Sequence, residues 1–177
     1  MINIFDKLKN PALAGLVKDQ RVRELITRRE FRVSDDYLQR EFIGQAGDDE
    51  LRELSIRFFE GHGELRGVVK KRLLPAISFS TRFTLHGVEF NSMGKRLHLA
   101  IEQVKPLDLE WVTRRIVERV PFLAYNDGLV TCDLTRVPRL RDLLAYELKG
   151  MQLANFVTLR EIGFQDGALV GRIALCL

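Results

Sequence analysis

The sequence contains few of the residues that build disulfide frameworks or metal centres. It has two cysteines and three histidines among 177 residues. Cys132 and Cys176 lie far apart and form no Cys-X-X-Cys motif, and His62, His86 and His98 fall in separate segments without a Cys, Asp or Glu pattern to complete a ligand set. We therefore expect reduced, buried thiols and predict neither a metal site nor a cofactor.

Long hydrophobic runs are also absent. No stretch approaches the roughly 20 consecutive apolar residues that a transmembrane helix requires. Charged residues interrupt the first nine positions, and no small-residue cleavage site follows them. Such a beginning is not typical of a secretory signal, so the sequence predicts a cytoplasmic protein.

Recognised catalytic and nucleotide-binding motifs are missing as well. The sequence has no GxGxxG, Walker lysine, GxSxG or HExxH motif. No pair of carboxylates has a spacing that argues for acid–base catalysis. We predict that the protein is not an enzyme and that its function depends on the shape of its fold.

Charge is mixed and rich in arginine. The formal net charge is +4, and basic residues cluster at several places, including residues 70–72 and 114–119. Acidic residues are interspersed with most clusters. The pattern fits either a solvated surface or contact with an anionic partner, such as phospholipid head groups. Nucleic-acid binding is disfavoured because no recognised motif or aromatic platform accompanies the arginines.

The clearest pattern is the alternation of apolar and polar residues. Ile77, Phe79, Thr81, Phe83 and Leu85 occupy every second position with polar residues between them. This alternation predicts a strand with one buried and one solvated face. Similar runs predict strands over residues 54–58, 65–69, 97–101, 130–134, 157–164 and 169–177. A glycine turn joins the first two runs, which favours a hairpin.

Helical periodicity is confined to four segments. A helix is predicted from Pro11 to about Arg28, a second after the cap residue Ser34, a third over 109–120 and a fourth over 137–148. Together with the strands, these segments predict an α+β fold. We expect a single domain over residues 1–177, with an N-terminal helical segment (1–30) before the α+β body (31–177).

Glycines lie inside several predicted strands. Gly61, Gly63 and Gly67 fall in the first hairpin, and Gly163 and Gly171 fall in the last two strands. Glycine within a strand often marks a bulge or strong curvature, and a curved antiparallel sheet can wrap a helix. Side chains alone could fill the space between them, or that space could hold an apolar ligand, and periodicity fits both.

The segment from Asp49 to Phe58, the glycine turn and the following strand to Lys71 resemble one block of small bacterial tubular lipid-binding (TULIP) domains. The later strands, the helix that ends at Pro121 and the final segment 166–175 follow the same order. The resemblance covers roughly residues 30 to 177. It implies helices packed in the concave face of a highly curved antiparallel sheet, with an apolar groove for acyl chains.

The leading hypothesis is therefore non-enzymatic binding of a lipid or fatty-acid-like ligand in a groove between helix and sheet. The residues predicted to line the groove are apolar and lie on the buried faces: Phe79, Phe83, Leu85, Leu97, Leu99, Ile101, Val112, Ile116 and Val120. The head-group candidates are Arg114, Arg115, Lys70 and Lys71, which would also suit transient contact with an anionic membrane surface.

The second hypothesis is a protein-interaction or assembly module that binds no small molecule. An exposed sheet edge, at the C-terminal strand over residues 169–177, would pair with a second chain and could form a homodimer. Co-purifying lipid would favour the first hypothesis, whereas a lipid-free dimer would favour the second.

Overall fold

The computed structural model describes residues 30–73, 75–91, 93–102, 110–138, 141, 144–145, 147–148, 151–155 and 157–175. These residues form an α+β fold with antiparallel sheets, as predicted. The helix predicted from Pro11 to Arg28 and the second cysteine, Cys176, lie outside the described residues.

The larger sheet has six strands in the order β2-β3-β4-β5-β7-β6. Its strands are β2 (Leu51–Phe59), β3 (His62–Val69), β4 (Ile77–Phe90), β5 (Lys95–Ile101), β6 (Leu123–Asn126) and β7 (Leu129–Asp133). The predicted hairpin is confirmed as β2 and β3. The alternating segment is confirmed as β4, which continues beyond Leu85 to Phe90 after a register shift.

A smaller sheet contains β1 (Glu30–Ser34), β10 (Val157–Gln165) and β11 (Ala168–Leu175), in the order β1-β11-β10. The prediction that the C-terminal strand offers a free edge is wrong, because β11 is the central strand and pairs on both sides. The predicted fourth helix does not reach residue 148, because β8 (Glu147–Leu148) pairs with β9 (Met151–Gln152).

Helix α3 (Asp35–Glu41) lies against the edge of β2. The backbone N–H of Ile56 donates to the Gln39 side-chain oxygen at 2.9 Å, and the N–H of Phe58 donates to the buried Asp35 carboxylate at 3.1 Å. Side chains of α3 thus take hydrogen bonds that another strand would otherwise accept. This cover makes β2 a poor site for pairing with a second chain.

Helix α4 (Glu110–Arg119) is fixed to the segment before β2 by ion pairs. The Asp48 carboxylate lies 2.6 Å from both Arg115 and Arg119, and Arg115 also bonds Glu50 at 2.9 Å. Burial acts to raise the pKa of Asp48, but hydrogen bonds from the backbone N–H groups of residues 51 and 50 and from Arg115 outweigh it. The pKa of Asp48 therefore lies below its usual value.

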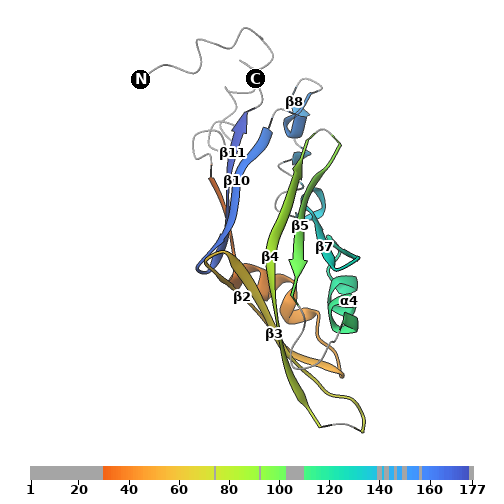
Figure 1. The fold of residues 1–177 in the computed structure, drawn as a ribbon. Helices are drawn as coiled ribbons and strands as arrows, with labels where there is room; N and C mark the ends of the chain where they lie inside the picture. The colour runs from red at the N-terminus through yellow and green to blue at the C-terminus, as the bar shows by residue number, and fades with distance from the viewer. Residues whose placement is uncertain are drawn as a thin grey trace.

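Both helices and the smaller sheet cover the same face of the six-stranded sheet. Strands β10 and β11, drawn in blue in Figure 1, run beside β4 and meet the β2–β3 hairpin near the middle of the molecule. There the N–H of Gly61 donates to Phe164 at 3.1 Å, and the N–H of Gly167 donates to Phe58 at 3.0 Å. The two sheets are therefore joined at their turns, whereas farther along they meet through apolar side chains.

The highly curved sheet predicted from the glycines is not seen, because the two larger sheets are open and not strongly curled. Three of the strand glycines lie directly opposite phenylalanines in the register: Gly63 with Phe83, Gly67 with Phe79, and Gly171 with Phe31. A Cβ atom at Gly63 would lie 2.2 Å from the Phe83 ring. These glycines make room for rings that lie over the neighbouring strand. Gly67 also lies opposite a register shift in β2, between Arg52 and Ser55.

A candidate ligand cavity

A cavity of about 160 Å³, partly open to solvent, lies between the two larger sheets and the two helices. The six-stranded sheet contributes inward-facing residues of β2, β3, β4, β5, β6 and β7 to its wall. Helices α3 and α4 contribute apolar residues from the side, and β1, β10 and β11 close it from the smaller sheet. The cavity is thus built from segments that are distant in sequence.

Three phenylalanines from three strands meet in the cavity wall. The Phe83 ring lies 6.3 Å from the Phe58 ring and 5.5 Å from the Phe164 ring, and Phe58 and Phe164 are 5.1 Å apart, measured between centroids. Such edge and tilted contacts are favourable for aromatic pairs. Because Phe164 belongs to β10 and the others to β2 and β4, the cluster packs the two sheets together where their turns are hydrogen-bonded.

The wall consists almost entirely of hydrocarbon. Its polar side chains are Thr81, Thr113 and Cys132, and the Thr81 hydroxyl already donates to the Glu102 carbonyl at 2.8 Å. Within the described ranges, no buried side-chain nitrogen or oxygen lacks a hydrogen-bond partner. The cavity therefore offers no polar atom that could hold a charged group, and it suits hydrocarbon alone.

The Cys132 thiol is shielded where it borders the cavity. Burial raises the pKa of this thiol to about 12, and the negative charge of Asp133 adds to the effect. A thiol with so high a pKa is a poor nucleophile and a poor metal ligand at neutral pH. Among the residues that the structure describes, no group of three or more His, Cys, Asp and Glu side chains could hold a metal ion.

Six of the nine residues predicted to line a groove lie in the cavity wall: Phe83, Leu97, Leu99, Ile101, Ile116 and Val120. The other three lie outside it. Phe79 covers Gly67, Val112 is packed in the core with 1% of its surface exposed, and Leu85 packs beside the wall against a neighbouring cluster. Alternation in β4 and β5 and helical spacing in α4 thus place most of these residues on faces that line the cavity.

The wall also contains residues that the sequence did not single out. Leu38, Phe42 and Ile43 come from α3 and the turn after it, and Phe31 and Val33 come from β1. The apolar spacing of Leu38 and Phe42 was visible in the sequence. Nothing local showed, however, that α3 faces the same interior as β4 and β5, because that contact depends on the long-range packing of α3 against β2.

The predicted head-group arginines are already paired. The Arg114 guanidinium lies 2.7 Å from Glu110 and also 5.0 Å from the Tyr125 ring centroid, and Arg115 belongs to the Asp48 cluster. Lys70 and Lys71 are exposed in the β3–β4 loop. None of these four side chains lines the cavity.

Comparison with known proteins gives no match to any protein-family model, curated protein or solved structure. No helix within the described residues is long and apolar enough to cross a membrane.

Proposed function

We propose that the protein binds an apolar ligand, a lipid or fatty-acid-like molecule, whose hydrocarbon is buried in the cavity between the two sheets. The observation that supports this proposal is a wall made almost entirely of hydrocarbon, which lines a cavity of about 160 Å³. Burial of each methylene group from water contributes about 0.8 kcal/mol. Such binding needs only apolar side chains, and these make up nearly the whole cavity wall.

The cavity volume limits the size of a ligand that can bind without a movement of the protein. An engineered cavity of about 150 Å³ lined by Leu, Ile and Phe takes up a molecule the size of benzene, whereas drug-sized ligands occupy sites of about 300–1,000 Å³. The cavity of about 160 Å³ therefore accommodates one ring or a short length of chain. A long acyl chain exceeds this volume, and separation of the two sheets would supply the additional space.

The contacts between the sheets suit such a movement. Backbone hydrogen bonds join them only at the turns among the described residues, through Gly61 with Phe164 and Gly167 with Phe58. Beyond these bonds, Leu159 and Ile162 of β10 pack against an apolar cluster that includes Leu97. Contacts between apolar side chains are non-directional, so the hydrocarbon chain of a ligand can take the place of the contacts between the sheets. The hydrogen bonds at the turns can stay intact during this change.

The first test is an organic extract of the purified protein analysed by mass spectrometry, together with binding of a fluorescent fatty-acid analogue. In the variant Val117→Phe, a larger apolar side chain is placed in the wall, because Val117 lines the cavity. We expect at least tenfold weaker binding of the analogue, with a change of no more than about 1–3 kcal/mol in stability.

Val88→Phe is the matched control, since Val88 is 39% exposed and lies away from the cavity wall. This control should bind the analogue as the wild type does. A lipid-free wild-type extract with no binding of the analogue would refute the proposal. A lipid-free dimer in solution would instead support the assembly hypothesis, through an edge other than β11.

A further inference from the structure

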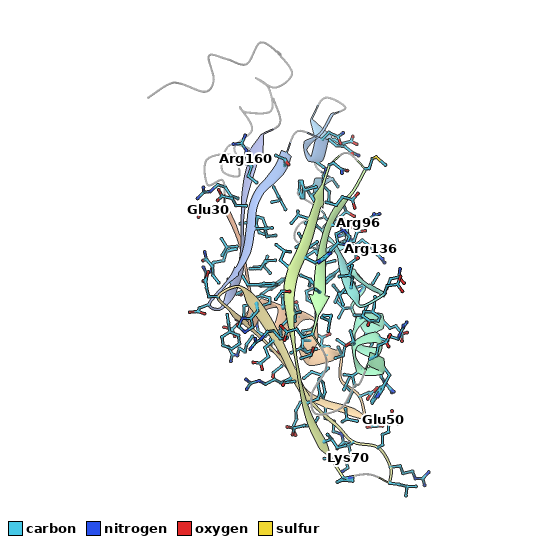
Figure 2. The ribbon with its side chains drawn as sticks, in the orientation of Figure 1. Glu30, Glu50, Lys70, Arg96, Arg136 and Arg160 are labelled. Atoms are coloured by element: carbon cyan, nitrogen blue, oxygen red, sulfur yellow. The ribbon has the colours of Figure 1, made fainter. Side chains whose placement is uncertain are left out.

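The β3–β4 loop forms an exposed basic tip, which we define as Lys70, Lys71, Arg72 and Leu73. All four residues are exposed, and Leu73 exposes 95% of its surface. The tip lies at one end of the elongated molecule, marked by Lys70 at the lower end of Figure 2. A single exposed leucine is ordinary on a protein surface, but here three consecutive cations precede it at the apex of a loop.

The only tryptophan of the chain lies beside this tip. The Lys71 ammonium is 4.5 Å from the centroid of the Trp111 ring, a favourable cation–π distance. Trp111 is half-buried and packs against the hydrophobic core from the start of α4. Tryptophan favours positions with one apolar side and one wet side, such as the boundary of a membrane.

Among the described residues, the acidic side chains nearest the tip are directed elsewhere or exposed. The Lys70 N–H donates to the backbone carbonyl of Glu50, but the Glu50 carboxylate is directed to Arg115 at 2.9 Å. Asp49, the acidic residue directly before Glu50, is exposed to solvent. The ion pairs of the described acidic residues nearest the tip, Asp48 and Glu50, are made with arginines of α4. The tip therefore presents three exposed cationic residues beside Leu73, one of which, Lys71, also contacts the Trp111 ring.

We infer that the basic tip docks on an anionic phospholipid surface. Lys70, Lys71 and Arg72 bind the head-group phosphates, Leu73 enters the acyl region, and Trp111 lies at the interface. Each cation near an anionic membrane contributes about a fivefold gain in affinity, and an inserted apolar side chain supplies the second signal that stable attachment needs. Docking does not depend on a ligand in the cavity, so it goes beyond the proposed function.

The test uses the full chain and vesicles of phosphatidylcholine with or without phosphatidylserine. We expect sedimentation with the phosphatidylserine vesicles only, weaker binding at high salt, and a blue shift of Trp111 emission on binding. The double variant Lys70→Gln, Lys71→Gln should bind about 25-fold more weakly. Leu73→Ser should weaken binding about tenfold and remove most of the blue shift, since the insertion is lost.

Two matched controls test whether vesicle binding depends on residues of the basic tip and not on exposed residues elsewhere. Met93 belongs to the β4–β5 turn and exposes 88% of its surface. This turn lies at the end of the molecule opposite to the β3–β4 loop in Figure 1. Arg136 is an exposed cation after β7. Met93→Ser and Arg136→Gln should leave vesicle binding within twofold of the wild type. Equal binding to both kinds of vesicle, or equal losses in Met93→Ser and Leu73→Ser, would overturn the inference. So would binding to DNA or RNA without binding to vesicles.

Discussion

Cys132 shows how burial changes the chemistry of one side chain. It lies on β7, where the thiol forms part of the cavity wall. Burial, with a smaller contribution from Asp133, raises the pKa of the Cys132 thiol to about 12, from an ordinary value of 9.0. Because the thiolate is the reactive form, the folded protein should protect this cysteine chemically.

The rate of thiol modification tests this protection. In a Cys176→Ser background, where Cys132 is the only cysteine, Ellman's reagent at pH 8 should react with the folded chain on the order of a hundredfold more slowly than with the urea-unfolded chain. The raised pKa also means that the unfolded thiol loses its proton first. Stability should therefore fall as the pH rises from 9.0 toward about 12, and fall less in Cys132→Ala. Equal folded and unfolded rates would contradict a buried thiol.

The sequence identified individual buried residues well where a regular pattern repeated. Phe83, Leu97 and Ile116 follow the period of a strand or helix, and all three lie in the cavity wall. The strong curvature predicted from the glycines is not seen, because the role of three of them depends on a phenylalanine in the neighbouring strand. Gly63 looks like a curvature residue in isolation, but across the register it faces Phe83.

At the scale of elements, Gly63 on β3 pairs with Phe83 on β4, and the Phe83 ring also lines the cavity. A change at Gly63 therefore affects both the packing of the sheet and the shape of the cavity. A methyl group at position 63 would meet the Phe83 ring at 2.2 Å, so the ring would have to move. Gly63→Ala should therefore lower the free energy of unfolding by about 1–3 kcal/mol, measured by urea denaturation. It should also alter uptake of the fluorescent analogue, because Phe83 lines the cavity.

Gly163→Ala provides the matched control for this prediction. A Cβ atom at Gly163 meets no heavy atom within 4 Å, and its backbone does not have a positive φ angle. The control should be neutral or slightly stabilising, because alanine restricts the unfolded chain more than glycine does. Equal losses in the two variants would show that the strands need glycine for a reason other than room for the ring.

The elements that the sequence missed are short. β1 spans only Glu30–Ser34 and β6 only Leu123–Asn126, so neither carries enough alternation to stand out. β1 nevertheless decides the architecture of the smaller sheet, because it places β11 in the centre. The Ser34 cap of α3 was predicted correctly, since the serine oxygen accepts a hydrogen bond from Tyr37 three residues later.

For the whole molecule, the cavity depends on how the two sheets meet, and no local pattern contains that information. The hydrogen bonds that join them link residues about a hundred positions apart, as between Gly61 and Phe164. Alternation predicts which residues face inward, but it does not predict whether the inward faces of two sheets touch or enclose a volume. The choice between a filled core and a ligand space could therefore be addressed only with coordinates.

If the joined turns act as a hinge, the apolar contacts that β10 makes beyond Phe164 control entry to the cavity. Ile162 is half-buried there and packs against the cluster of Leu97 and Leu134 without lining the cavity. Ile162→Ala should remove about 1–1.5 kcal/mol of closing contacts and speed uptake of a long-chain fluorescent fatty acid up to about tenfold in stopped-flow measurements. Val88→Ala, an exposed substitution on β4, should leave the rate unchanged. An unchanged rate in Ile162→Ala, with intact ligand affinity, would show that the ligand enters by a route other than separation of the sheets.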